Sequence, residues 1–455
     1  MKKWKFWLLT AVILSFSGCV KTEKAGEQEQ AEDIQKEDAG QDNFAEEPDY
    51  SQELPEDYEG TLTMWGWDDI YYKTIAEAFQ KKYPGVSIEY TAVENGDLYQ
   101  RYENALRTGG ELPDIGWAML PYRAEIYELD MWENLAEEPY NFKLTEVYDY
   151  VRPLLTDSKG QVCGLEQSLC TAGLAYRRDL TKEYLGTDDP EELEAMFPTW
   201  EAFAEKGQEI YENTGGEVCM WPGIADAQSF IREQKDEAWI QGNEIKVTEA
   251  LGESIETVCL LRDTHTADTM EAWTPEWYEA IGEGKYLFIA CAPWTVAFQI
   301  ESYDPEGETS GHWGLMNAPE GNIWWGGTAM GITKTCQDKR LAWEFIRFAA
   351  LSTDGARALR SIGLFTTAVA PYAEALELSS FQNPWFGEQD IGNYFLQHIA
   401  PEVHIRKHTM GESQIHDSLN LMNTALRQDP QMTAEEAVKY LKEDLQERFP
   451  SYKIE

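Results

Sequence analysis

The sequence predicts an α/β fold in which helices cover the faces of a parallel sheet. Strand-like and helix-like segments alternate between residues 61 and 117, the pattern of consecutive strand–helix–strand units. The same alternation returns between residues 199 and 351. The chain has 455 residues. About 400 of them follow an atypical N-terminal region, which is enough for two or three domains with large cores.

The first strand and helix are predicted at residues 61–67 and from Asp68 onward. The segment 61–67 is rich in residues that favour a strand. Asp68 and Asp69 suit a helix start, because acidic side chains interact favourably with the unpaired amides there. Apolar residues recur every four positions from Ile75 to Tyr83, which predicts the buried face of a helix.

A second strand is expected at residues 86–93, a helix at about 98–106 and a short strand at 113–117. The carboxyl ends of parallel strands form the ligand-binding edge of such sheets, so we expect the side chains that follow these strands to line a site. These side chains are Trp67, Asp68, Asp69, Glu94 and Trp117.

The rest of the chain continues the alternation without an internal repeat. A strand is predicted at residues 286–292 and ends at Pro293 and Trp294, which places another tryptophan at a strand end. The other predicted elements are a strand at 328–332 and helices at 199–210, 341–351, 417–426 and 433–449.

The N-terminus has the pattern of an export signal. A basic head is followed by an apolar run over residues 6–16, too short for a membrane-spanning helix. Small residues then precede Cys19, which resembles the lipobox of bacterial lipoproteins. We therefore predict a signal peptide at residues 1–18 and lipidation of Cys19, which would place the protein on the outer face of the cell membrane.

The segment after this cysteine is strongly acidic. Residues 20–58 contain fourteen Asp or Glu, three Lys and almost no large apolar residues. Such a segment buries too little surface to offset the entropy of ordering. We therefore predict that residues 19–58 form a disordered tether between the lipid anchor and a folded body.

Charge excludes some partners. The formal net charge is −45, which opposes binding to nucleic acid or to anionic lipid headgroups. We expect the membrane to be contacted only through the lipid anchor.

Cysteine and histidine spacing gives no sign of a metal centre. No Cys-x-x-Cys pair occurs. Cys163 and Cys170 have a spacing that allows a bridged hairpin in an oxidising compartment, but small buried hydrophobes are the favoured interpretation for the cysteines. His404 and His408 have the helical spacing of a metal pair, yet no His-Glu-x-x-His motif is present. We expect neither a metal nor another cofactor.

Six short motifs carry a family resemblance through their order and spacing. They lie at residues 78–86, 110–115, 173–180, 198–203, 327–334 and 342–346. Together they resemble the carbohydrate-type extracellular solute-binding proteins of bacterial ABC importers, the broad family that includes maltose-binding protein. Residues 164–166 depart from the glycine–hydrophobic–proline pattern of that family.

The resemblance implies a two-lobe, periplasmic-binding-protein-like fold of type II. Each lobe would have a mixed, mainly parallel sheet flanked by helices, with the ligand in the cleft between the lobes. The family's functional partner is the transmembrane permease of an ABC transporter, and we expect a monomer without catalytic residues. The implied boundaries are 59–168 plus 326–372 for the first lobe and 169–325 plus 373–455 for the second.

Tryptophan is the most informative residue type for the ligand. The chain has 17 Trp, many at predicted loops or strand ends. An aromatic ring covers the flat C–H face of a pyranose, and carboxylates accept hydrogen bonds from its hydroxyls. Trp200 and Trp343, inside predicted helices, are assigned to the core. The predicted ligand-binding residues are Trp67, Asp68, Asp69, Glu94, Trp117, Glu166, Trp221, Trp294, Trp324 and Trp325.

Two other classes of function stay open from sequence. Aromatic clefts with carboxylates also occur in glycoside hydrolases and lyases, although no nucleophile motif stands out. Acidic residues beside aromatic walls would also suit a polyamine, a peptide or another small organic solute. The capture of a sugar or an oligosaccharide remains the preferred prediction.

Overall fold

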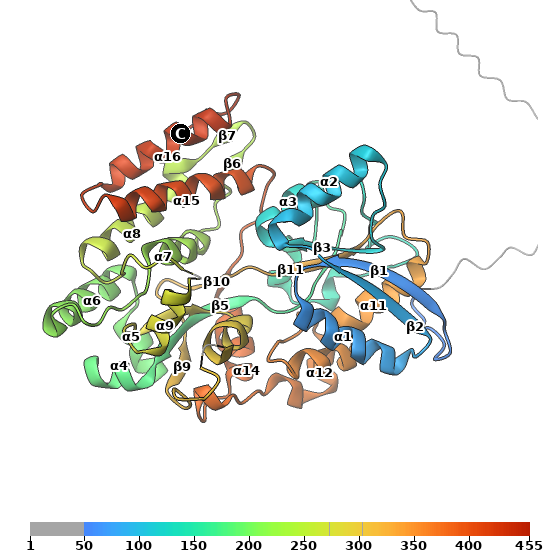
Figure 1. Cartoon of the computed structure of the whole chain (residues 1–455), viewed down its shortest axis with the longest axis horizontal. Coiled ribbons are helices and arrows are strands. Elements are labelled where there is room, and N and C mark those ends of the chain that lie inside the picture. Colours follow the sequence, from blue (N-terminus) through green and yellow to red (C-terminus); the bar gives the residue numbers. More distant parts are fainter. Residues whose placement is uncertain (1–49, 273, 303) are drawn as a thin grey trace, which may run out of the picture. The chain divides into compact units, whose positions relative to one another are not determined.

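The computed structural model describes residues 50–455, apart from residues 273 and 303 (Figure 1). The predicted signal peptide, the lipidation of Cys19 and most of the predicted tether lie outside the described residues. None of the described helices is both long and apolar enough to cross a membrane. The folded part has two five-stranded sheets flanked by helices, which confirms the predicted two-lobe α/β fold.

Lobe 1 contains the first sheet and the helices that pack on it. Its strands are β1 (Gly60–Gly66), β2 (Val86–Ala92), β3 (Ile115–Met119), β4 (Leu165–Glu166) and β11 (Thr328–Ile332). Its helices are α1 (Asp69–Lys82), α2 (Leu98–Thr108), α3 (Leu120–Tyr127), α11 (Lys339–Leu351), α12 (Thr353–Arg360) and α13 (Ala370–Glu374). In Figure 1, α2 and α3 lie on one side of the sheet, and α1, α11 and α12 lie on the other.

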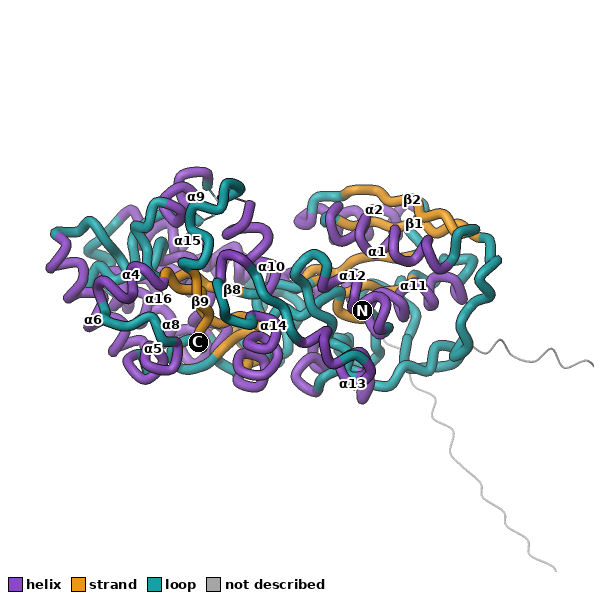
Figure 2. The backbone as a smooth tube through the Cα atoms, turned by 90° about the horizontal axis from the view of Figure 1, so that it is seen from below, coloured by secondary structure: helices purple, strands orange, loops and turns teal. Residues whose placement is uncertain are grey.

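Lobe 2 contains the second sheet and most of the later helices. Its strands are β5 (Thr171–Arg177), β8 (Phe288–Cys291), β9 (Trp313–Met316), β10 (Asn322–Trp324) and β12 (Val403–His404), and a small separate sheet holds β6 (Ile240–Gln241), β7 (Glu244–Ile245) and β13 (Lys453–Ile454). Its helices are α4 (Arg178–Tyr184), α5 (Pro190–Met196), α6 (Trp200–Thr214), α7 (Ile224–Ile231), α8 (Gly252–Asp263), α9 (Pro275–Gly282), α10 (Pro293–Thr295), α14 (Ile391–Tyr394), α15 (Glu412–Gln428) and α16 (Ala434–Arg448). Figure 2 shows these helices around β8 and β9.

Strand direction differs between the two sheets. In lobe 1 the order is β2-β1-β3-β11-β4, and β1 runs parallel to both β2 and β3, as predicted. In lobe 2, β5 pairs antiparallel with β8, β9 and β10, and only β10 and β12 are parallel. The prediction of a mainly parallel sheet is therefore wrong for lobe 2. β9 and β10 run in the direction opposite to β5 along one stretch of it after the other, and β8 also runs opposite to β5, so strands in both directions alternate in this sheet.

Two segments pass between the lobes side by side. One joins β4 to β5 and the other joins β10 to β11. Backbone hydrogen bonds link them, from Trp325 N to Cys170 O at 2.8 Å and from Gln167 N to Thr328 O at 2.9 Å. Residues 325–328 therefore lie where a ligand between the lobes would meet the chain, and we call them the crossing segment.

The first residues that the structure describes pack on lobe 1. Leu54 is 4% exposed, the Tyr58 hydroxyl donates to Asp338 at 2.9 Å, and Lys82 forms an ion pair with Glu53 at 2.7 Å. The tether was predicted to extend to residue 58. This boundary is wrong, because residues 50–58 belong to the folded body. One buried leucine and a few specific contacts are enough to order this segment despite its acidity.

The described cysteines are buried residues of the hydrophobic cores. The six cysteines within the described part of the chain are all buried, with free thiols. Cys163 and Cys170 are therefore not bridged, and the alternative of a disulfide between them is wrong.

Candidate functional site

One cavity is lined by both lobes, and we call it the cleft pocket. Its volume is about 300 Å³. Its described lining comes from the start of α3 (Met119, Leu120, Pro121 and Tyr122), from α7 and the residues after it (Ser229, Arg232 and Glu233), from the crossing region (Trp324, Trp325 and Gly326) and from the region of α15 (His408, Ser413, His416, Asp417 and Asn420).

A second cavity adjoins it on lobe 2, and we call it the α7–α15 pocket. Its volume is about 360 Å³, and it shares Ser229, Trp325 and Asn420 with the cleft pocket. Its other described lining residues are Ala225, Asp226, Glu271, Ala272, Asn423, Thr424 and Arg427. The shared residues make the two cavities parts of one hollow surface.

A third cavity of about 260 Å³ also has walls from both lobes. Asp68 and Ile70 at the start of α1 and residues 361–364 line it from lobe 1, and residues 296–298, Glu301 and Phe381 complete it. The lobes therefore enclose more than one hollow.

Two tryptophans form a pair at the crossing segment. The rings of Trp294 and Trp325 lie 4.9 Å apart at 49° and are half-buried. The Trp294 indole N–H donates to the Trp325 carbonyl at 3.1 Å, and the following residue, Gly326, has a positive φ of 73°. Trp67, 39% exposed, is held on the same segment by a hydrogen bond to Thr328 Oγ1 at 3.2 Å. These rings provide apolar surface beside polar cavities.

A buried carboxylate and amide lie in the α7–α15 pocket. Asp226 is 5% exposed, and its Oδ2 accepts a hydrogen bond from Trp221 Nε1 at 2.9 Å. Burial raises the pKa of the Asp226 carboxyl to about 6, although the hydrogen bond from Trp221 opposes this shift. Asn423 is 2% exposed, and its Oδ1 has no hydrogen-bond partner among the residues that the structure describes. A buried acceptor without a partner costs about 1–3 kcal/mol, which a ligand hydroxyl would offset.

The position of α15 depends on lobe 1. Its N-cap residue, Gly411, makes no side-chain cap. Instead Glu125 of α3 accepts hydrogen bonds from the Gly411 and Ser413 amides at 3.1 and 3.2 Å and from the Ser413 hydroxyl at 2.7 Å. A carboxylate satisfies the unpaired amides of a helix start and interacts well with its dipole. The first turn of α15 is therefore fixed at the boundary between the lobes.

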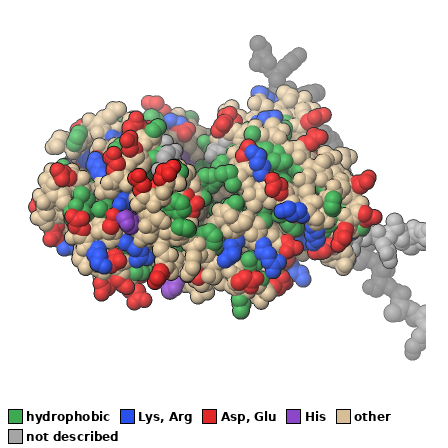
Figure 3. All heavy atoms as spheres, turned by 60° about the horizontal axis from the view of Figure 1, so that its bottom comes forward, with side chains coloured by type: hydrophobic (Ala, Val, Ile, Leu, Met, Phe, Trp, Pro, Cys, Tyr) green, Lys and Arg blue, Asp and Glu red, His purple; other side chains and the backbone are tan. Residues whose placement is uncertain are grey.

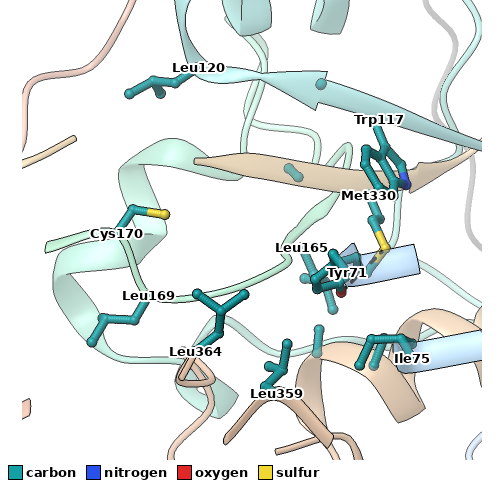
Figure 4. Close-up of a cluster of buried hydrophobic side chains, with 14 of the residues drawn as sticks. Tyr71, Ile75, Trp117, Leu120, Leu165, Leu169, Cys170, Met330, Leu359 and Leu364 are labelled. Carbon is teal, nitrogen blue, oxygen red and sulfur yellow. Dashed lines mark hydrogen bonds between the residues drawn. The ribbon is translucent and has the colours of Figure 1, made fainter. Parts of the chain in front are cut away.

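Two predicted ligand tryptophans are core residues instead. Trp117 and Trp221 are both 0% exposed. The Trp117 ring packs edge-on against Tyr71 at 5.7 Å and lies near Met330 (Figure 4), in space that a side chain at Gly66 would occupy. The placement of both rings on the cleft surface was wrong, because each lies in the hydrophobic core of its own lobe: Trp117 lies within β3, and Trp221 packs on Trp200 and Phe203. Trp221 touches the site indirectly, through its hydrogen bond to Asp226.

Two further predicted residues are mostly enclosed. Trp324 is 4% exposed, and it is one of the residues that line the cleft pocket. Glu166 is 1% exposed and forms a buried ion pair with Arg123, whose Nη2 lies 3.2 Å from Glu166 Oε2. Glu166 therefore stabilises the crossing between the lobes, and the prediction that it contacts a ligand is wrong.

The remaining predicted carboxylates differ in their accessibility. Asp68 caps α1 by accepting hydrogen bonds from the amides of Ile70 and Tyr71 at 2.9 and 3.0 Å, and it lines the third cavity. Burial raises the pKa of Asp68 above its ordinary value. Asp69 is exposed and pairs with Lys73 at 3.0 Å, and Glu94 is exposed. Neither Asp69 nor Glu94 lines one of the three cavities.

The sequence reasoning missed Asp226, Asn420 and Asn423. They lie on the helices α7 and α15, whereas the site was predicted mainly at the ends of strands. A signal existed in α15, because polar residues recur at positions 413, 416, 417, 420, 423, 424 and 427. That spacing marks one polar face, but sequence alone gives no reason to place a cavity over it.

An ionic cluster forms one end of the cleft pocket. His408, Glu412 and His416 come within 4.8 Å of one another through potential metal-ligand atoms. However, Arg406 binds Glu412 at 2.7 Å, and Arg232 lies 3.0 Å from His416 Nδ1. Burial, aided by Arg232, lowers the pKa of His416 to about 3 and keeps it neutral. Guanidinium groups so close oppose a further cation, so we assign no metal to this cluster. His404, which has the helical spacing of a metal pair with His408 in the sequence, is not part of this cluster. Its Nδ1 lies 3.5 Å from Asp236 Oδ1.

Comparison with known families decides what this arrangement is. Residues 68–355 match the model of the bacterial extracellular solute-binding protein family. The chain belongs to that family. Its members are binding proteins that act outside the cytoplasm, which accords with a cavity between two lobes.

Solved structures show the same fold. An extracellular solute-binding protein of family 1 superposes with a TM-score of 0.75 at 18% identity, over 86% of this chain and 99% of that one. The sugar-binding protein MalE of Xanthomonas citri gives 0.68 at 18% identity, over 86% and 98%. The galacto-N-biose/lacto-N-biose I-binding protein of an ABC transporter from Bifidobacterium longum, solved with lacto-N-biose, gives 0.69 at 17% identity, over 87% and 99%.

Proposed function

We propose that this protein captures a saccharide between its lobes and delivers it to the membrane permease of an ABC importer. The observation that carries the proposal is the Trp294–Trp325 pair next to the buried acceptors Asp226 and Asn423. Trp325 itself lines both adjoining cavities. Apolar rings and buried acceptors thus lie within one hollow surface.

The chemistry of a pyranose matches these two kinds of group. Its C–H face packs on an indole ring, which has little conformational entropy to lose. Its hydroxyls donate hydrogen bonds to carboxylate and amide oxygens, and bonds to a charged acceptor contribute about 1.5–3 kcal/mol. The structural relatives support the assignment, since several were solved with saccharides, among them lacto-N-biose and β-1,6-galactobiose.

Capture is proposed to be stoichiometric, without turnover. A glycoside hydrolase needs two carboxyl groups across the scissile bond, one of them accessible as a nucleophile or base. In the α7–α15 pocket, Asp226 is buried and held by Trp221, and Glu271 forms an ion pair with Arg427 at 3.3 Å. These partners suit binding more than proton transfer. Recovery of unchanged ligand after prolonged incubation is the expected result, and release of cleaved product would contradict it.

The export signal and Cys19 support an anchor on the outer face of the membrane. The protein is proposed to act there as a monomer. The wild-type protein is expected to fractionate with membranes in its host, and Cys19→Ala is expected to release it. Retention of the Cys19→Ala variant in the membrane fraction would show that residues 1–18 act as an uncleaved anchor.

A cationic solute is the second candidate. Asp68 and Glu301 line the third cavity, and no Lys or Arg is among its described lining residues. Acidic and aromatic walls together would hold a polyamine. This candidate predicts that spermidine, rather than a sugar, stabilises the protein.

A thermal-shift screen against neutral sugars, oligosaccharides, polyamines and short peptides tests the proposal. A ligand that binds only the folded state raises the melting temperature by an amount that grows with the ratio of its concentration to its dissociation constant. We expect a saccharide to give the largest rise, and to lose that effect in Trp294→Ala. A rise with polyamines alone would contradict the assignment.

A further inference from the structure

The polar face of α15 runs from one cavity into the next. Ser413 and Asp417 line the cleft pocket, Asn420 lines both the cleft pocket and the α7–α15 pocket, and Thr424 lines only the latter. These positions follow the three- and four-residue spacing of one helix face. An α-helix rises about 1.5 Å per residue, so the stripe from Ser413 to Arg427 extends over about 21 Å. That distance exceeds the size of a monosaccharide several times.

A larger cavity lies at the far end of this stripe, and we call it the distal pocket. Its volume is about 590 Å³, the largest of the cavities described here. It lies entirely within lobe 2, between the end of α8 and the turn that joins α15 to α16. Arg427 lines both the distal pocket and the α7–α15 pocket, so the two adjoin at this side chain.

The boundary between these two cavities is a weak ion pair. Arg427 Nη1 lies 3.3 Å from Glu271 Oε2, and the Glu271 side chain is 69% exposed. Exposed pairs of this kind contribute little, because water screens them and both side chains lose entropy when they are held. A ligand can therefore lie across the pair, or exchange one of its hydrogen bonds for a hydroxyl, at small cost.

The walls of the distal pocket carry both donors and acceptors. Asp263 and Gln431 are exposed at its edge, and Lys285 and Asp268 pair at 2.6 Å inside its lining. Mixed acids, amides and an ammonium suit the hydroxyls of a sugar, which both donate and accept. No single charge dominates this lining.

We propose that the ligand groove continues along α15 into the distal pocket, so that the ligand is an extended oligosaccharide. This inference rests on the proposed function. One end of the saccharide lies at the Trp294–Trp325 pair, the middle crosses Asn420 and Asn423, and the other end passes Arg427. A disaccharide fills only the cavities near the tryptophan pair.

The test compares short and long members of matched series by calorimetric titration. The pairs are maltose and maltohexaose, cellobiose and cellohexaose, and xylobiose and xylohexaose. In the series that binds, the long member is expected to bind at least about tenfold tighter than the short one. Gln431→Trp and Thr269→Trp, which fill the distal pocket from two walls, should remove this gain and leave the affinity for the disaccharide unchanged.

Gln428→Trp is the matched control, since Gln428 is exposed at the end of α15 and lines none of the four cavities. It should keep the gain, and all three variants should melt near the wild-type temperature. Equal affinity for short and long members, or a gain that persists in both blocking variants, would overturn the extended groove while leaving saccharide capture intact. Failure of these pairs and of every saccharide in the thermal-shift screen would overturn the proposed function and the groove with it.

Discussion

Lobe 1 lines the cleft pocket with the start of α3, where Met119, Leu120 and Pro121 are apolar and only Tyr122 carries a polar atom in its side chain. Lobe 2 lines the same pocket with polar side chains: Arg232 and Glu233 just after α7, and Asp417 and Asn420 of α15. It also holds the whole α7–α15 pocket except Trp325 of the crossing segment. The two walls thus differ in chemistry although they face one cavity.

The difference indicates a division of work between the lobes. Lobe 2 carries the groups that distinguish one polar ligand from another, because buried acceptors reject a ligand that leaves them unpaired. Under the proposed function, the apolar wall of lobe 1 would act as a cover that excludes water from the ligand, as in binding proteins whose lobes close about a hinge. Acidic side chains spread over both lobes on the face that Figure 3 shows, so this face does not repeat the contrast between the two cavity walls.

Loss of an aromatic ring from the pair should have the largest effect on binding. Trp294→Ala removes half of the ring pair, and burial of one large side chain contributes about 1.5–3 kcal/mol, so affinity for the saccharide found in the screen should fall about 10- to 100-fold. The measurement is calorimetric titration. Trp385→Ala is the control, because Trp385 is also half-buried and hydrogen-bonded, but it bonds to Asp304, whereas Trp294 packs on Trp325, which lines two cavities. Wild-type affinity in Trp294→Ala would show that the cleft has been misplaced.

Removal of residues 50–58 should lower stability and leave binding intact. Leu54 and Tyr58 pack on lobe 1, and loss of one buried leucine costs about 2 kcal/mol. A chain that begins at Gly60 should therefore melt several degrees below one that begins at Val20, measured by circular dichroism. Equal melting temperatures would show that residues 50–58 contribute no stability and would restore the predicted boundary at residue 58.

Loss of the charge on Asp226, the buried acceptor of lobe 2, should have the next largest effect on saccharide affinity. Asp226→Asn keeps the size of the side chain but replaces a charged acceptor by a neutral one, so saccharide affinity at neutral pH should fall about tenfold. Glu435→Gln, at the exposed start of α16, changes the net charge equally without touching a cavity. If Glu435→Gln weakens binding as much as Asp226→Asn, the long-range field of the protein sets the affinity, and if neither variant weakens binding, Asp226 does not contact the ligand.

The same carboxyl should give a pH dependence of stability. Burial raises the pKa of Asp226 to about 6 in the folded protein, above an unfolded value of about 4. The folded state then holds this proton more tightly, so its contribution to stability is complete below about pH 4 and is lost as the pH rises through about 6. Relative to Asp226→Asn, the wild-type protein should become less stable between about pH 4 and 6.5, with little further change above that. Melting curves with a constant difference across this range would contradict the raised pKa.

The smallest effect is expected on the lobe 1 wall. Tyr122→Phe removes the only side-chain hydroxyl that this wall brings to the cleft pocket, and affinity should fall at most about threefold. Contacts around a binding centre mainly exclude water and contribute little each. A loss larger than that of Asp226→Asn, by the same titration, would reverse the comparison between the lobes.

Local patterns in the sequence determined the elements and their order. The four-residue apolar spacing from Ile75 to Tyr83 lies within α1 and its C-cap, and the motif order predicted two α/β lobes. The strand-end rule also brought Trp67 and Trp294 to the crossing segment. These outcomes follow because helix and strand periodicity depends on neighbours in the chain.

Only the tertiary structure decided which of these side chains face a cavity. Trp67 and Trp117 both follow predicted strands, yet Trp67 is 39% exposed and Trp117 is fully buried, because Gly66 and Tyr71 leave a space that the second ring fills. In the sequence nothing distinguishes Asp226 from the rest of the 82 acidic residues. The fold gives it a hydrogen bond from Trp221 and places it in the same pocket as Asn423. The burial of a side chain depends on residues from distant segments that pack against it. The spacing of residues within one segment does not reveal which distant residues these are.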